Sequence, residues 1–154
     1  MADYCGKIRT NYFSVTDVDK FHQLMEMCVS DGGPIKVFMD KSTDDGSTMF
    51  GFYCNGTILG LPEAIDNTEP NDLDYESCDD DYDLDLFYMF LQRLLTKDTA
   101  IIITEIGSKE FCYFIGECTI ITKTEMRVLE VQTTAIIEAR EMLGNDDYMT
   151  RVHD

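Results

Sequence analysis

The chain has 154 residues, of which 44% are hydrophobic and 27% are charged. This length predicts a single hydrophobic core, the apolar content excludes wholesale disorder, and no apolar run reaches the roughly 18 to 20 residues of a membrane span. Thirty Asp and Glu residues against twelve Lys and Arg residues give a net charge of −18. This balance excludes a protein that binds nucleic acid directly, because such proteins need cations to displace the counterions of phosphate.

The first part of the chain predicts a strand, a helix and a hairpin. Residues 7–15 are rich in β-branched and aromatic types, which favour a strand. Apolar residues at helical spacing predict a helix over 18–29. The Asp-Gly-Gly-Pro segment at 31–34 is expected to end this helix. Strands are expected at 35–40 and 48–55, because the Asp-Gly turn chemistry between them is typical of a hairpin.

A long acidic loop, residues 62–80, separates this part from a second helix. That helix is expected over 81–96, where apolar residues recur at helical spacing after an acidic start, and negative side chains in a first turn are favoured by the helix dipole. The remaining expected elements are a hairpin of strands 99–106 and 110–122 turning at 107–109, a strand over 126–132 and a helix over 133–143. Gly144–Asn145 is expected to end the last helix.

Consecutive hairpins imply antiparallel pairing, and this predicts the fold class. We expect an α+β domain with a mainly antiparallel sheet of five to six strands and about three helices packed on one face. Residues 1–144 form this single domain, and residues 145–154 are expected to be a flexible tail. In the last helix, the side chains expected to face inward are Ala135, Ile136, Ala139, Met142 and Leu143.

The six cysteines favour a reducing compartment. The start of the chain lacks the apolar stretch of a signal peptide, so we expect a cytoplasmic location and cysteines that act as small core hydrophobes. No Cys-x-x-Cys pair occurs, and only His22 and His153 offer imidazole, so neither a structural zinc site nor another cofactor is expected. His22 borders an apolar helix stripe without a catalytic partner, and no phosphate-binding glycine loop occurs. We therefore expect no enzyme activity.

The acidic residues are concentrated in one block. Between Lys41 and Arg93 there is no Lys or Arg, whereas thirteen Asp and Glu residues occur. Such a block repels itself, which costs stability. One interpretation is a solvated loop that keeps the protein soluble. A second is calcium binding by the alternating Asp79–Asp85 segment, but Leu84 stands at the EF-hand position for Gly and Phe90 at that for Glu, so we expect no metal site.

The third interpretation is imitation of nucleic acid. Eleven carboxylates lie within the 23 residues 63–85. Folded compactly, at about 1.5 Å per residue, the segment carries one charge per roughly 3 Å, close to the spacing of phosphates along one DNA strand. Its tyrosines add rigid contact area. The expected partner-binding acidic face consists of Glu63, Asp66, Glu69, Asp72, Asp74, Tyr75, Glu76, Asp79, Asp80, Asp81, Tyr82, Asp83 and Asp85.

The first predicted strand carries two cations, Lys7 and Arg9. Lys7 and Arg9 alternate on the first strand, so they are expected to form a small polar patch on its exposed face. The plainer expectation is that both are solvated strand residues with acidic cross-strand partners.

Two short segments resemble a known group of proteins. Residues 8–15, Ile-Arg-Thr-Asn-Tyr-Phe-Ser-Val, and residues 139–145, Ala-Arg-Glu-Met-Leu-Gly-Asn, resemble small acidic proteins carried on conjugative and phage-like elements of gut Gram-positive bacteria. The resemblance implies a setting in which mobile DNA is attacked by host restriction or CRISPR nucleases, and it carries over no catalytic residue. It favours an anti-CRISPR or anti-restriction DNA mimic whose partner is a basic nucleic-acid-binding protein, a defence nuclease. The alternative is a general protein-interaction module of a mobile element, in which the acidic loop only solvates.

Overall fold

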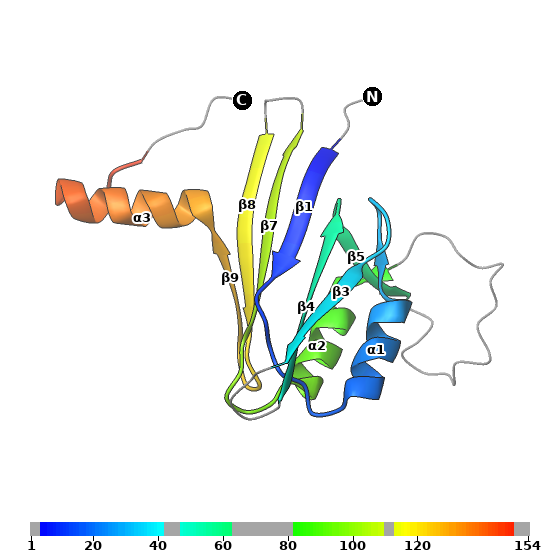
Figure 1. The fold of residues 1–154 in the computed structure, drawn as a ribbon. Coiled ribbons are helices and arrows are strands. Elements are labelled where there is room, and N and C mark those ends of the chain that lie inside the picture. The colour runs from blue at the N-terminus through cyan, green and yellow to red at the C-terminus, as the bar shows by residue number, and fades with distance from the viewer. Residues whose placement is uncertain (1–3, 42–46, 63–81, 110–112, 150–154) are drawn as a thin grey trace.

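The computed structural model describes residues 4–41, 47–62, 82–109 and 113–149. Its main sheet has six antiparallel strands in the order β3-β4-β1-β7-β8-β9 (Figure 1). These strands are β1 (Tyr4–Thr10), β3 (Lys36–Lys41), β4 (Thr48–Asn55), β7 (Ile101–Lys109), β8 (Tyr113–Ile121) and β9 (Met126–Glu130). A smaller sheet holds β2 (Val29–Ser30), β5 (Ile58–Pro62) and β6 (Tyr82–Asp83). The predicted α+β class with a mainly antiparallel sheet is confirmed, and both predicted hairpins form.

Two helices cover one face of the main sheet. Helix α1 (Val18–Met27) begins at Asp17, whose side chain accepts a hydrogen bond from the Lys20 backbone N–H at 3.1 Å. Helix α2 (Leu84–Leu94) lies beside it on the same face (Figure 1). Both helices direct their apolar stripes toward the sheet, as the sequence predicts. The largest fully buried side chains of the core are Phe13, Phe21, Phe52, Phe87, Leu61, Leu91, Leu95, Ile101 and Ile121.

The strand register separates an inner face, toward α1 and α2, from an outer face. On β1, Ile8 and Thr10 are buried on the inner face, whereas Lys7 and Arg9 are exposed on the outer face. On β7, Ile101 and Ile103 are buried in the same way. We use the term "outer face" for the outward side chains of β1 and β7, which are Cys5, Lys7, Arg9, Ile102, Thr104, Ile106 and Ser108.

The turn of the second hairpin lies later in the chain than predicted. Residues 107–109 do not turn, because they continue strand β7: Gly107 pairs with Gly6 on one side and with Ile115 on the other. β7 is a central strand, so pairing with two neighbours extends it past the Gly-Ser dipeptide that locally favours a turn. The turn itself lies outside the described residues.

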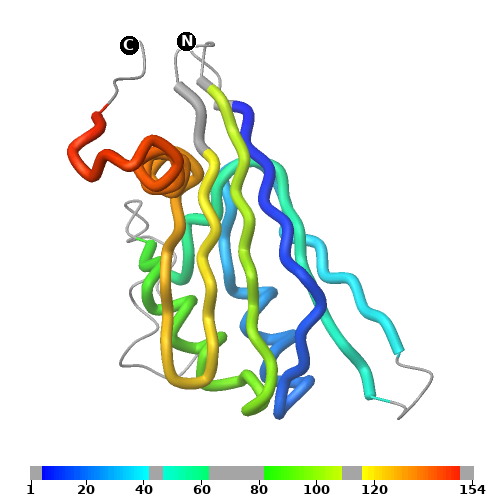
Figure 2. The backbone as a smooth tube through the Cα atoms, turned by 90° about the vertical axis from the view of Figure 1, so that its left-hand side faces the viewer, coloured from blue at the N-terminus to red at the C-terminus, as the bar shows by residue number. Residues whose placement is uncertain are grey.

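The third helix, α3 (Val131–Leu143), forms as predicted and ends at Gly144, whose φ of 60° is the left-handed conformation typical of a glycine cap. It does not pack its apolar stripe inward, however, because none of its residues is buried. It begins directly after edge strand β9, and Val131 lies against Gly116: a Cβ added at Gly116 would be 2.9 Å from Val131 Cγ2. The helix then projects away from the sheet, on the side opposite to α1 and α2 (Figures 1 and 2).

Candidate functional site

The acidic segment 63–81 joins the described part of the domain at strands β5 and β6. Strands β5 and β6 pair antiparallel, with Leu61 opposite Asp83 and Pro62 opposite Tyr82. These pairs are the last described residues before the segment 63–81 and the first after it. The two ends of the segment are therefore neighbours in a small sheet that packs against α2.

The C-terminal end of this attachment is held by Asp83. Its carboxylate accepts a hydrogen bond from the Leu86 backbone N–H at 3.0 Å, which caps helix α2. Gly60, with φ of +111°, lies against the backbone of Asp83, where an added Cβ would clash with the Asp83 carbonyl oxygen. Asp83 therefore has a structural role. Asp85 lies exposed in the first turn of α2.

The predicted acidic face is described only at its C-terminal end. The structure brings Tyr82, Asp83 and Asp85 together at the start of α2, where Tyr82 and Asp83 are half-buried. The other predicted members lie outside the described residues: Glu63, Asp66, Glu69, Asp72, Asp74, Tyr75, Glu76, Asp79, Asp80 and Asp81. The described residues contain 16 Asp and Glu and 11 Lys and Arg, so most of the net charge of −18 belongs to the rest of the chain.

Three carboxylates form a row across the main sheet, and the sequence pattern does not predict this row. Glu117 on β8 lies opposite Glu105 on β7 and opposite Glu130 on β9. Burial raises the pKa of Glu117, and the negative charges of Glu105 and Glu130 raise it further. Thr57 donates a hydrogen bond from Oγ1 to Glu105 Oε1 at 3.2 Å. The predicted turn at 107–109 hid this row, because a hairpin turning there does not place Glu105 opposite Glu117.

Tyr88 on α2 lies near the same row. Burial raises the pKa of its phenol to about 12, and the charges of Glu105 and Glu117 act in the same direction. Its ring packs beside Phe87, with ring centroids 5.9 Å apart. Tyr88 is therefore a packing residue.

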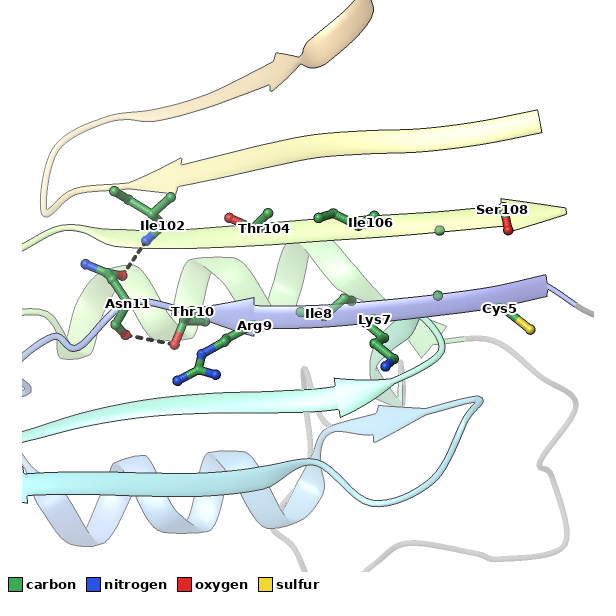
Figure 3. Close-up of a pocket in the computed structure, with 12 residues that line it drawn as sticks. Cys5, Lys7, Ile8, Arg9, Thr10, Asn11, Ile102, Thr104, Ile106 and Ser108 are labelled. Carbon is green, nitrogen blue, oxygen red and sulfur yellow. Dashed lines mark hydrogen bonds between the residues drawn. The ribbon is translucent and has the colours of Figure 1, made fainter. Parts of the chain in front are cut away.

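The outer face forms a shallow groove of about 840 Å³ (Figure 3). Lys7 and Arg9 are exposed on it, as predicted, but their cross-strand partners are not acidic: Lys7 pairs with Asn55 and Ile106, and Arg9 with Tyr53 and Thr104. The expectation of acidic cross-strand partners is therefore wrong. The Arg9 guanidinium instead lies over the Phe38 ring, 5.4 Å from its centroid.

The thiols of the described residues are unpaired. Cys28 and Cys54 are buried in the core, Cys118 is half-buried and Cys5 is exposed. Burial raises the pKa of Cys28 to about 12, and it also raises that of Cys54. These two buried thiols act as small core hydrophobes, as predicted; Cys78 and Cys112 lie outside the described residues.

Across the described ranges, no group of three or more His, Cys, Asp or Glu side chains is placed to hold a metal ion. Nor does this part of the chain contain a helix long and apolar enough to cross a membrane. His22 is exposed, and its ring lies 5.6 Å from that of Phe50. No family model, no curated protein and no solved structure matches this chain.

Proposed function

We propose that the chain is a non-enzymatic inhibitor that presents residues 63–85 to the basic nucleic-acid channel of a defence nuclease, of the anti-CRISPR or anti-restriction type. The observation that carries the proposal is the uneven distribution of charge. Eleven carboxylates and no cation lie in these 23 residues, whereas the described residues hold 11 cations and 16 anions. Because a one-signed segment destabilises a free protein by self-repulsion, its concentration at one place favours a role outside the domain.

The paired ends of the segment support this role. With Pro62 and Tyr82 side by side, the 19 residues between them reach at most about 30 Å from their attachment, because the chain must return to it. Phosphates along one DNA strand are about 3.4 Å apart. Residues 63–85 carry one charge per roughly 3 Å if they fold compactly, so their charge density suits a channel built for a short stretch of duplex.

The mechanism is competition for cations. Lys and Arg side chains that line a nucleic-acid channel hold small anions when the channel is empty, and a dense row of carboxylates releases these anions as phosphates do. The inhibitor needs no base contacts, so it competes with every DNA sequence. This mechanism implies that binding weakens as the salt concentration rises.

The test is displacement of a fluorescent DNA duplex from purified single-effector CRISPR and restriction nucleases, followed by anisotropy at several salt concentrations. We expect the wild-type chain to displace the duplex from at least one nuclease, more strongly at low salt. A variant with Asp79, Asp80, Asp81 and Asp85 replaced by Asn should lose this ability. Asp83 stays unchanged because it caps α2.

The matched control changes the net charge by the same amount elsewhere. It replaces four exposed residues outside the acidic face by Asn: Asp40, Asp98, Asp146 and Asp147. This control should inhibit like the wild type. Equal inhibition by the two variants, displacement that does not depend on salt, or no displacement from any nuclease tested would each refute the proposal.

A second candidate function is a protein-interaction module in which the acidic segment only solvates. The observation that favours it is the exposure of large apolar side chains on the outer face and on α3, including Ile106 at 65% and Met142 at 86%. Such a module should keep its partner in the four-Asn variant and lose it when these apolar residues are changed.

A further inference from the structure

Helix α3 buries none of its side chains in the part of the chain that the structure describes. It has 13 residues, none of them buried, and five of them are β-branched. A helix of this length is marginal in water on its own, and β-branched residues lower its propensity further. Its apolar side chains Ile137, Met142 and Leu143 are all exposed. These features indicate that another surface covers α3.

The outer face has the complementary properties. Ile102 and Ile106 are exposed at its centre, and Lys7 and Arg9 flank them. Neither cation on this face forms an ion pair with a carboxylate of the described residues. Although the chain has a net charge of −18, Lys7 and Arg9 are exposed on this face and can pair with the carboxylates of a partner.

Helix α3 matches this surface in charge and length. Glu138 and Glu141 lie one turn apart beside Met142, so two carboxylates border its apolar side chains. The helix is about 20 Å long, and the seven residues of β1 extend about 23 Å. A helix of this length, lying along β1, therefore spans most of the groove.

The helix does not cover the outer face of its own sheet. Val131 lies against Gly116 on β8, and from there α3 projects away from the sheet (Figures 1 and 2). In the part of the chain that the structure describes, no helix covers the outer face, and the projecting helix of a second copy is available to occupy it. β9, the strand that precedes α3, also lies at the opposite edge of the main sheet from β3 (Figure 1).

We propose that two copies of this chain form a reciprocal dimer in which α3 of each copy lies on the outer face of the other. The occupant of the groove is thus the helix of an identical chain. Exposed apolar side chains of α3 cover Ile102 and Ile106, and Glu138 and Glu141 pair with Lys7 and Arg9. Reciprocal exchange uses the same two surfaces twice, as a two-fold interface requires.

The test begins with the mass of the full-length chain in solution, measured by light scattering after size exclusion. We expect twice 17.6 kDa for the wild type and 17.6 kDa for Met142→Asp, which changes a side chain outside the core. The matched control is Met39→Asp on β3, which is also highly exposed but lies at the other edge of the sheet, and it should remain a dimer. A monomeric wild type, or a dimer that survives Met142→Asp, would overturn the proposal and leave the groove for a different partner.

A charge exchange then tests the assigned pairing. Variant one carries Lys7→Glu and Arg9→Glu, variant two carries Glu138→Lys and Glu141→Lys, and each alone should be monomeric because like charges meet. Mixed in equal amounts they should form a heterodimer, since each helix then meets a sheet of opposite charge. Failure of the mixture to associate, with both variants folded by circular dichroism, would refute the pairing. The result does not depend on nuclease inhibition.

Discussion

Asp83 belongs to the predicted acidic face, but it is the N-cap of helix α2 and stabilises that helix. We expect Asp83→Ala to destabilise the protein, because the Leu86 backbone N–H loses the carboxylate that accepts its hydrogen bond at 3.0 Å. Loss of such a cap costs about 1 kcal/mol, within a range of about 0.5 to 2. For a chain of this length, 1 kcal/mol corresponds to a change in Tm of about 2 to 4 °C.

The contribution of the cap to stability is isolated by comparing the Asp83→Ala and Asp83→Asn variants. Both substitutions remove the negative charge, and both therefore relieve the same repulsion from neighbouring carboxylates. Only Asn keeps a side-chain oxygen that caps the helix, so Asp83→Asn should unfold about 2 to 4 °C above Asp83→Ala. Thermal unfolding followed by circular dichroism in 1 M NaCl, where the screening length is about 3 Å, reduces the remaining charge effects.

Asp85 provides the control for this comparison. It lies two residues further along the same acidic run, but within the described residues its carboxylate accepts no hydrogen bond. Asp85→Ala should be at least as stable as Asp85→Asn, because alanine has the higher helix propensity. Equal Tm values for the two Asp83 variants would refute the capping role and return Asp83 to the set of residues available to a partner.

Two further predictions concern titratable groups. Burial raises the pKa of Glu117, and the charges of Glu105 and Glu130 raise it further. Between the unfolded and the folded pKa of Glu117, the folded state therefore binds more protons than the unfolded state. The free energy of unfolding falls as pH rises through this window. Glu117→Gln should therefore stabilise the protein at pH 7 by about 0.2 to 1 kcal/mol and remove this dependence in urea unfolding; no gain at pH 7 would contradict the repulsion. Burial raises the pKa of Cys28 to about 12, so at pH 8 its thiol should react with iodoacetamide much more slowly than the exposed Cys5 thiol, as measured by peptide mass spectrometry; similar rates would show that the core opens readily.

Local patterns predicted the element types well where short-range chemistry decides them. The hairpin of β3 and β4 forms because turn residues separate two β-prone runs, and α2 forms because an apolar stripe follows an acidic start. The prediction failed for the turn at 107–109, where the same glycine and serine chemistry is present. There, pairing of β7 with strands on both sides outweighs the local preference.

The candidate site was predictable in part. The acidic block is a property of the sequence, and it was identified without any structure. The pairing of Pro62 with Tyr82 brings the ends of segment 63–81 together. It was not predicted, because a two-residue strand such as β6 carries no periodic signal. The outward side of Lys7 and Arg9 followed from strand alternation, but the identity of their neighbours depended on a register set by distant residues.

The sequence by itself determined the fold class, the types of most elements, and the concentration of negative charge between Lys41 and Arg93. These features depend on composition and on periodicities of two and 3.6 residues, which act over short stretches of chain. Only the tertiary structure decided that α3 projects from the sheet with no buried residue, and that Glu105, Glu117 and Glu130 share one row. Strand order and the side on which a helix lies are set by packing between residues far apart in the chain, which local patterns do not encode.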